Sequence, residues 1–171
     1  MILNKQILRK KIKQERKNIN SDKLSLLLVK KLMQTKEYTQ AKNIMLFYPL
    51  ENELNLLSLL DDKTKNFYLP KIENKTLLCC PFEKNDELCE SRFKTKEPLS
   101  KPVEKYLIDL VIIPALAVDK EYYRLGYGGG FYDRFLLDIN CFKVVCIAKE
   151  FIVDTVYPES HDVKIDKIIS A

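Results

Sequence analysis

The chain has 171 residues, of which 46% are hydrophobic and 31% are charged, and its formal net charge is +5. This length supports one well-filled core and excludes two ordinary domains, so we expect a single domain over residues 1–171. The positive charge is concentrated at the N-terminus, because residues 1–36 hold eleven Lys and Arg against two acidic residues, a net charge of +9. Such a basic segment is typical of proteins that bind polyphosphates or nucleic acids.

The cysteines and the apolar runs exclude several other classes. The five cysteines are odd in number and form no C-x-x-C pair, which argues against a disulfide framework and against a zinc site. The first residues pass directly into basic ones, so we expect no signal peptide. The longest apolar run, 107–118, is interrupted by Asp109 and Pro114 and is shorter than the ~20 residues that a bilayer requires. We therefore expect a cytoplasmic protein with no membrane partner.

The first third of the chain predicts two helices and a strand. In residues 4–18 the apolar side chains recur with a helical period, and Lys5 and Arg9 stand four residues apart on a basic strip. A second helix is predicted to begin at Ser21, a residue favoured at the N-cap. Residues 43–48 then predict a buried strand.

The middle of the chain predicts several short elements, a loop and one strand that is almost wholly apolar. A short helix is expected near residues 54–60, followed by strands at 67–69 and 77–82. The charged and Pro-containing residues 83–104 predict a loop. Residues 107–113 are nearly all apolar, as expected for a strand of a parallel sheet that helices cover on both faces.

All four glycines of the chain lie within residues 126–130. Glycine lets the backbone approach a ligand closely or adopt positive φ, and its entropic cost disfavours it elsewhere. Consecutive peptide N–H groups without side chains can form a concave anion site, especially before a helix. A flexible turn also selects glycine. However, Arg124 precedes this segment, and aromatic and charged residues follow it at 131–134, so the segment predicts a phosphate-binding loop.

The residues that follow the glycine segment place it within a larger unit. A helix is predicted over 131–139 and a strand over 142–148, which together with the strand at 107–113 make a βαβ unit. The loop then lies at the carboxyl ends of the strands, where open α/β sheets bind ligands. We predict an α/β fold: a three-layer α/β/α domain with a mostly parallel, Rossmann-like sheet.

Three common nucleotide-binding templates do not fit the spacing. The Walker pattern requires Lys and then Ser or Thr after its last glycine, where this chain has Phe131 and Tyr132. The dinucleotide fingerprint, read from Gly126, requires glycine at position 131, and the protein-kinase loop fails at the same position.

The run Arg-Leu-Gly-Tyr-Gly-Gly-Gly-Phe-Tyr-Asp-Arg at 124–134 resembles the signature of the 5-formyltetrahydrofolate cyclo-ligases, also called methenyltetrahydrofolate synthetases. The chain departs from that family at Ala115 and Tyr122, where members usually carry glycine, and at Gly129, where some members carry lysine. Further residues follow the family's order along nearly the whole chain: Lys5, Arg9, Glu53, Phe93, Glu97, Pro98, Pro114, His161 and Asp162.

The resemblance implies an ATP-dependent ligase of one-carbon metabolism. Its reaction converts 5-formyltetrahydrofolate and ATP, with Mg²⁺, into 5,10-methenyltetrahydrofolate, ADP and phosphate through a phosphorylated formyl group. Phosphoryl transfer leaves the protein mainly positioning and charge stabilisation to supply, so no protein nucleophile is required. The resemblance also implies that the partner is a small molecule, the folate, with the number of glutamates on its tail left open, and we expect a monomer. No specific nucleic-acid partner is expected.

The same resemblance implies the roles of individual residues, with Lys5 and Arg9 making the N-terminal helix part of the ATP site. Arg124 and Tyr132 would be catalytic, and Asp133 and Asp162 would bind Mg²⁺. ATP would contact Lys5, Arg9, Arg124, Leu125, Gly126, Tyr127, Gly128, Gly129, Gly130, Phe131 and Tyr132. The folate would contact Tyr48, Glu53, Tyr127, Gly128, Gly129, Gly130 and Phe131.

The residues alone leave two other functions open. Another ATP-dependent phosphotransferase that uses the same glycine loop would bind ATP with Mg²⁺ but not the formyl folate. A basic nucleic-acid-binding protein would use the N-terminal segment, with an affinity that falls steeply with salt, although no recognised nucleic-acid module is present. Taken alone, Lys5 and Arg9 indicate a solvated helix face, and Asp133 beside Arg134 indicates a surface ion pair.

Overall fold

The computed structural model describes the chain from Ile2 to Ala171, and Met1, the first residue of the expected domain, lies outside the described residues. A six-stranded sheet forms its centre, in the order β11-β9-β6-β1-β2-β3. All neighbouring strands are parallel except β2 and β3, which are antiparallel. The predicted mostly parallel sheet is confirmed. Its strands are β1 (Asn43–Met45), β2 (Asn66–Glu73), β3 (Thr76–Pro81), β6 (Leu110–Ile112), β9 (Phe142–Ile147) and β11 (Lys167–Ser170).

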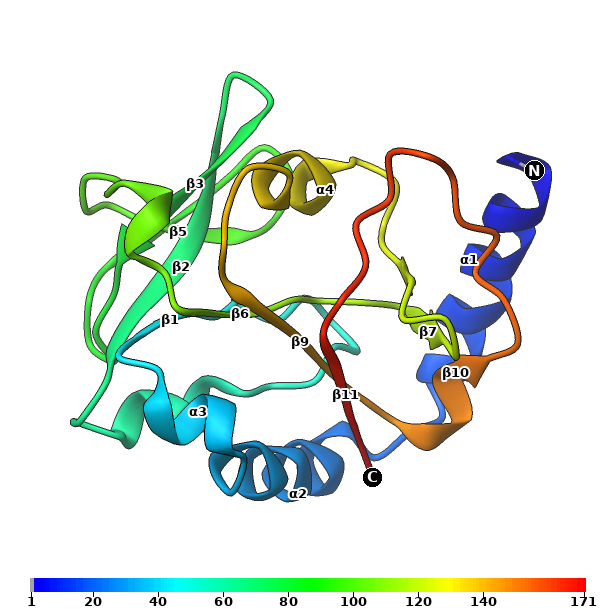
Figure 1. Cartoon of the computed structure of the whole chain (residues 1–171), viewed down its shortest axis with the longest axis horizontal. Helices are drawn as coiled ribbons and strands as arrows, with labels where there is room; N and C mark the ends of the chain where they lie inside the picture. The colour runs from blue at the N-terminus through cyan, green and yellow to red at the C-terminus, as the bar shows by residue number, and fades with distance from the viewer. Residues whose placement is uncertain (1) are drawn as a thin grey trace.

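Helices cover both faces of this sheet, which confirms the predicted three layers. Helices α2 (Ser21–Met33) and α3 (Lys36–Gln40) lie against one face and α4 (Phe131–Leu136) lies against the other (Figure 1). Successive residues of β6 belong to different hydrophobic clusters, one on each face of the sheet. Leu110 and Ile112 pack with α2, whereas Val111 packs with α4. Both faces are therefore apolar, which explains the continuous apolar sequence of this strand.

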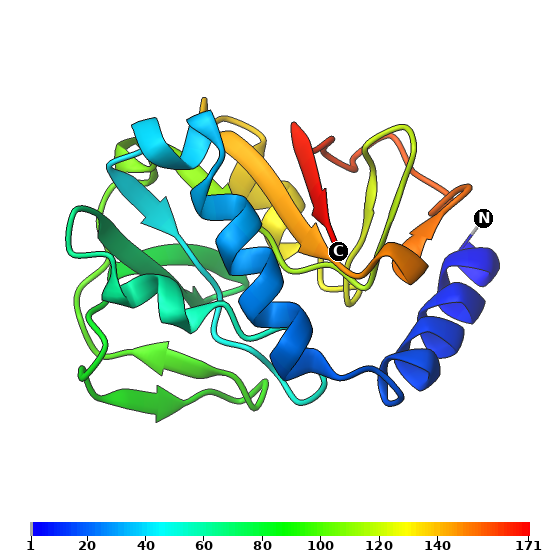
Figure 2. The same cartoon turned by 90° about the horizontal axis from the view of Figure 1, so that it is seen from below.

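Helix α1 (Ile2–Arg16) lies at one end of the molecule and is separate from α2, which crosses its middle (Figure 2). It lies beside a small second sheet made of β7 (Ala117–Asp119), β8 (Arg124–Leu125) and β10 (Ile152–Val153). Its inward side chains Ile12 and Arg16 are buried, and the Arg16 guanidinium lies 5.3 Å from the centre of the Phe151 ring. None of the described helices is long and apolar enough to cross a membrane.

Several elements differ from the sequence-based expectation. Residues 83–104 are not a continuous loop, because β4 (Leu88–Glu90) and β5 (Lys96–Pro98) form an antiparallel hairpin within them. The helix near residues 54–60 is a 3-10 helix, η1 (Leu57–Asp61).

The bounds of other elements also differ from those predicted. Helix α2 is capped by Asn20, whose side chain accepts a hydrogen bond from the Lys23 amide at 3.2 Å, so Ser21 is its first residue and not its N-cap. The strand predicted at 107–113 is shorter and follows a 3-10 turn, η2 (Lys105–Leu107). A third 3-10 turn, η3 (Lys149–Phe151), follows β9.

Candidate active site

A cleft of about 700 Å³ opens at the carboxyl ends of β1 and β6. Phe47 and Tyr48 line it after β1, and Pro114 lines it after β6. This edge of an open α/β sheet is where ligands bind in such folds. The cleft gathers segments from both ends of the chain, and the structure brings every predicted site residue to it: Lys5, Arg9, Tyr48, Glu53, Arg124, Leu125, Gly126, Tyr127, Gly128, Gly129, Gly130, Phe131, Tyr132, Asp133 and Asp162.

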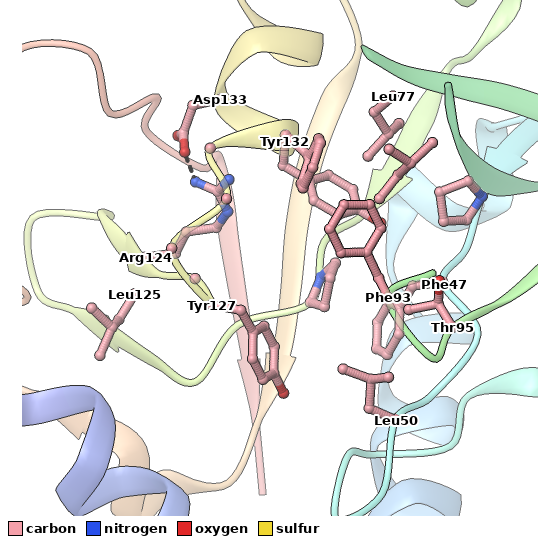
Figure 3. A pocket seen from close by; sticks show the side chains of 18 of the residues that line it. Phe47, Leu50, Leu77, Phe93, Thr95, Arg124, Leu125, Tyr127, Tyr132 and Asp133 are labelled. Carbon is pink, nitrogen blue, oxygen red and sulfur yellow. Dashed lines mark hydrogen bonds and ion pairs between the residues drawn. The ribbon is translucent and has the colours of Figure 1, made fainter. Parts of the chain in front are cut away.

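The two sides of the cleft differ in character. Apolar side chains of β2, β3 and the neighbouring loops form one side, including Leu77, Phe47 and Phe93 (Figure 3). Charged side chains form the other side, where Arg124 faces Asp133. A ligand that fills the cleft therefore meets a large apolar surface on one side and a charged surface on the other.

The backbone of the glycine loop, residues 126–130, explains why glycine stands there. Gly128 has φ +107°, a conformation that side chains other than hydrogen rarely allow. At Gly129 a Cβ atom would lie 2.6 Å from the ring of Phe131, which is closer than atoms can approach. The loop therefore exposes bare backbone to the cleft, as the sequence predicted.

Arg124 and Asp133 form a buried ion pair at the two ends of the glycine loop. The Arg124 Nη1 and Asp133 Oδ1 atoms are 2.8 Å apart, and the side chains are only 4% and 15% exposed. The Val163 amide donates to the same Asp133 oxygen at 3.1 Å. Burial raises the pKa of Asp133, but the hydrogen bond and charge of Arg124 outweigh it, so this pKa is lowered overall. Asp133 therefore stays ionised and holds the guanidinium in place.

Two cations of α1 reach across to other segments. Lys5 is only 6% exposed, and its Nζ lies 2.6 Å from Asp162 Oδ2 and 3.5 Å from Glu159 Oε2. The Arg9 Nε donates to the carbonyl of Gly126 at 2.9 Å. For Lys5 the expectation of a solvated helix face is wrong, because the amine is buried against the C-terminal segment. Helix α1 thus forms a wall of the cleft.

Glu53 and Tyr127 close the cleft on the side of β1. The Tyr127 hydroxyl donates to Glu53 Oε1, and the Leu50 amide donates to Oε2 at 2.7 Å. Burial and then the charge of Glu53 raise the pKa of Tyr127, so its hydroxyl keeps its proton. The Lys13 Nζ lies 5.2 Å above the centre of the Tyr127 ring.

Comparison with known proteins identifies the family that carries this site. A sequence model described as "5-formyltetrahydrofolate cyclo-ligase family" matches residues 2–171. The chain belongs to this family. The resemblance stated from the glycine segment is thereby confirmed.

Individual relatives agree with the family match. The chain is similar to the 5-formyltetrahydrofolate cyclo-ligase of Haemophilus influenzae, with 34% identity over 58% of each chain. It is also similar to a probable 5-formyltetrahydrofolate cyclo-ligase of Schizosaccharomyces pombe, with 25% identity over 87% of this chain and 84% of that one. The solved structure of 5,10-methenyltetrahydrofolate synthetase from Aquifex aeolicus matches with a TM-score of 0.86 and 27% identity, over 97% of this chain and 89% of that one.

Within this cyclo-ligase cleft, two polar groups have no partner in the described part of the chain. The Tyr132 hydroxyl and the Arg124 Nε are both buried and make no hydrogen bond there. Burial raises the pKa of Tyr132, with the charge of Glu53 as the second cause. Because buried polar groups are nearly always satisfied, these two unpartnered atoms are unusual and distinguish Arg124 and Tyr132 among the residues that line the cleft.

Two carboxylates beside the glycine loop each keep one oxygen without a hydrogen bond from the described residues. Asp133 and Asp162 each use one oxygen for the protein, so Asp133 Oδ2 and Asp162 Oδ1 accept no hydrogen bond from the described residues. The described residues contain no group of three or more acidic, His or Cys side chains that could hold a metal. A metal here would thus need further ligands from a substrate or from water.

Sequence reasoning assigned no role to two other carboxylates of the cleft. Glu97 is buried and accepts a hydrogen bond from the Ile72 amide at 3.2 Å. Its place in the family's order was a usable signal. Glu159 joins the cleft because the turn at 159–162 brings it to Lys5, and no spacing in the sequence indicated this.

Proposed function

We propose that the protein is an ATP-dependent 5-formyltetrahydrofolate cyclo-ligase that releases 5,10-methenyltetrahydrofolate, ADP and phosphate. The observation that carries this proposal is the cleft in which an apolar, aromatic side meets a charged side across the glycine loop, with Lys5, Arg9 and Arg124 set among carboxylates. The folate's pterin and aminobenzoyl rings suit the apolar side, and a triphosphate with its metal ion suits the charged side. Family membership over residues 2–171 gives the same answer independently.

The reaction must convert the formyl oxygen, a poor leaving group, into a better one. A formamide carbonyl is a weak electrophile, and its oxygen cannot depart as oxide when N10 attacks. The formyl oxygen therefore attacks the γ-phosphorus of ATP, and the bond to ADP breaks. The N10 lone pair then attacks the formyl carbon, the carbon–oxygen bond breaks as phosphate departs, and N10 loses its proton. What remains for the protein is to align the reactants and exclude water.

The residues of the cleft fit these tasks. Lys5, Arg9 and Arg124 bring three cationic side chains to the glycine loop, where they would donate charge-assisted hydrogen bonds to phosphate oxygens, and Asp162 and Asp133 hold two of them in place. The ion pair with Asp133 fixes the Arg124 guanidinium, and its unpartnered Nε is free to donate to a phosphate oxygen. The buried Tyr132 hydroxyl is the second group without a partner among the described residues and completes the polar lining at the reacting group.

The remaining contacts divide between the folate and the nucleotide. Tyr48 and Glu53, which follow β1, would contact the folate. The glycine loop and its flanking aromatic residue Phe131 would lie between the folate and the triphosphate, so its bare backbone touches both.

Asp133 and Asp162 would hold Mg²⁺ through their free oxygens. Mg²⁺ is usually bound by one or two carboxylates together with substrate phosphates and water, so this donor set suits it. When bound, the ion neutralises charge on the transferred phosphoryl group. Asp133 and Asp162 meanwhile keep Arg124 and Lys5 in position through their other oxygens.

The other functions considered are not favoured. The family match covers almost the whole chain, which disfavours an unrelated phosphotransferase. Against a nucleic-acid-binding role, Lys5 is buried and Arg9 is bound to the glycine loop, so these two cations face the cleft and not the outer surface of α1. We further propose a monomer that acts in the cytoplasm, because one chain supplies the whole cleft and the five cysteines are free thiols.

The assay is direct. Purified protein incubated with 5-formyltetrahydrofolate, ATP and Mg²⁺ should develop the near-ultraviolet absorbance of the methenyl product. No absorbance change with folded protein would overturn the proposal.

Lys5→Gln should lower kcat/KM for ATP about tenfold or more, as expected for loss of a buried charge contact. The matched control is Lys11→Gln on the same helix, since Lys11 is 67% exposed and, among the described residues, forms an ion pair with Glu15 alone.

A further inference from the structure

One carboxylate on the apolar side of the cleft has an oxygen that the protein leaves without a partner. Glu97 is only 6% exposed, and it lines the cleft. Its Oε1 accepts a hydrogen bond from the Ile72 amide at 3.2 Å. Its Oε2 accepts no hydrogen bond from the described residues and is not enclosed by protein atoms, so this oxygen faces the open space of the cleft.

The fold fixes the position of Glu97 through its other oxygen. Strand β1 pairs with β2 at residues 66–68, and beyond Tyr68 this edge of β2 continues without β1. Strand β5 brings Glu97 to that edge, where the side chain accepts the Ile72 N–H. The carboxylate is therefore anchored to the central sheet by Oε1 while Oε2 stays open to a ligand.

No cation compensates for the charge of Glu97, which forms no ion pair within the described chain. The other acidic residues that line the cleft are either paired with a cation or have a donor at both oxygens: Asp133, Glu159, Asp162 and Glu53. A buried carboxylate without a cation is costly unless hydrogen-bond donors surround it. The complement of Oε2 is therefore a ligand that carries N–H groups.

We propose that Glu97 binds the N3–H and the 2-amino group of the folate's pterin ring, an inference that rests on the proposed function. This edge of the pterin presents two donors side by side, and a carboxylate presents two acceptor oxygens in matching geometry. Oε2 is wholly free, and Oε1 keeps a second lone pair beside the Ile72 amide. Adenine fits less well, because its 6-amino donor stands beside N1, whose lone pair would face the second carboxylate oxygen.

Binding of this edge at Glu97 also orients the reacting atoms. N5, which carries the formyl group, and C6, from which the chain to N10 leaves, belong to the other ring of the pterin. Phe93 and Thr95, just before Glu97 in the chain, lie across the cleft from Arg124 and Asp133 (Figure 3). A pterin held at Glu97 therefore directs its formyl group toward the glycine loop and the charged side, where the triphosphate would lie.

Glu97→Gln tests the assignment, because it keeps an oxygen for the Ile72 amide and replaces Oε2 with an NH2 group. The pterin donors then meet a donor. The Kd for 5-formyltetrahydrofolate, measured by calorimetry without ATP, should rise about tenfold or more, as expected for lost hydrogen bonds to a charged group. The KM for ATP should stay unchanged. The matched control is Glu90→Gln, which removes the same charge from an exposed residue of β4 outside the cleft and should leave both values unchanged.

An altered folate separates recognition from a structural effect. In one analogue of 5-formyltetrahydrofolate a methyl group replaces the 2-amino group, so the donors at this position are lost while the rest of the molecule is kept. The unmodified enzyme should bind this analogue about tenfold or more weakly than 5-formyltetrahydrofolate. Glu97→Gln should lose most of this difference, because the protein partner of the 2-amino group is then missing.

The outcomes distinguish this inference from the proposed function. Equal Kd values for the two folates in the unmodified enzyme would overturn the inference, while turnover of 5-formyltetrahydrofolate upholds the cyclo-ligase activity. An undiminished difference in Glu97→Gln, or a higher KM for ATP with unchanged folate binding, would also overturn it. If the unmodified enzyme does not convert 5-formyltetrahydrofolate, the proposed function fails. The comparison of the two folates on the unmodified enzyme tests the inference even if Glu97→Gln does not fold.

Discussion

The Tyr127 hydroxyl donates a hydrogen bond to Oε1 of Glu53, and this contact ties the glycine loop to the turn that follows β1. Because the Leu50 amide occupies Oε2, both oxygens of the Glu53 carboxylate already have a donor. Glu53 would also contact the folate. A folate donor that approaches Oε1 of Glu53 would share that oxygen with the Tyr127 hydroxyl, so we expect the two donors to compete and substrate binding to depend on the position of the loop.

Tyr127→Phe tests this competition, because it removes the hydroxyl and keeps the ring. A hydrogen bond to a charged group contributes about 1.5–3 kcal/mol, so the variant should unfold at lower denaturant. Without the competing donor, Glu53 is free for the substrate, and the Kd for 5-formyltetrahydrofolate should fall about fivefold or more. Binding is measured by calorimetry in the absence of ATP. Glu53→Gln is the matched variant, and it should weaken folate binding instead. Weaker binding in both variants would contradict the competition.

The Arg124–Asp133 ion pair predicts a pH dependence of stability. The pKa of Asp133 is lowered overall in the folded protein, so its contribution is present above the ordinary carboxyl pKa and is lost as pH falls through the folded value. The free energy of unfolding should therefore decrease from about pH 5 to about pH 3, and less steeply in Asp133→Asn. Urea titrations at several pH values measure both slopes. The control is Asp154→Asn, since Asp154 is 94% exposed and should leave the slope unchanged.

The sequence was sufficient where one local pattern decides the structure. Strand β6 was predicted because its residues pack alternately on α2 and α4, which requires an unbroken apolar run. The glycine loop was predicted because Gly128 and Gly129 hold positions where a side chain is strained or clashes. These features leave a signature within a few neighbouring residues.

Other features depend on which distant segments meet, and local spacing carries no such information. The Lys5–Asp162 contact joins residues at opposite ends of the chain, so the buried state of Lys5 could not be read from its helical strip. The hairpin of β4 and β5 was missed because its residues are mostly exposed or partly exposed and lack an apolar alternation. A second hollow, lined by Lys75, Arg92 and Arg134, likewise exists only because two turns and α4 converge on the glycine loop.

Two glycines of the loop separate an effect on the ligand from an effect on the fold. At Gly126 a Cβ atom would have no heavy atom within 4 Å, so Gly126→Ala should change the free energy of unfolding by less than about 0.5 kcal/mol. A rise of the KM for ATP in this variant would then indicate that the phosphates lie close to the backbone of Gly126. At Gly129 the added Cβ meets Phe131, so Gly129→Ala should displace that ring and raise the KM for the folate. Unchanged kinetics for both variants would show that substrates do not approach the loop backbone.

Tyr132→Phe should separate catalysis from stability most clearly. The hydroxyl is buried and has no hydrogen-bond partner among the described residues, which costs the folded protein about 1–3 kcal/mol. Its removal should therefore leave the melting temperature unchanged or raise it, whereas kcat should fall about tenfold or more because the substrate loses a partner. Tyr68→Phe is the matched control, since the Tyr68 hydroxyl donates to Asn43 at 3.1 Å outside the cleft. That variant should lose about 1 kcal/mol of stability with unchanged kcat. If Tyr132→Phe loses stability but keeps full activity, the hydroxyl has a structural role. That result would mean that a group within the protein, and not the substrate, compensates for its burial.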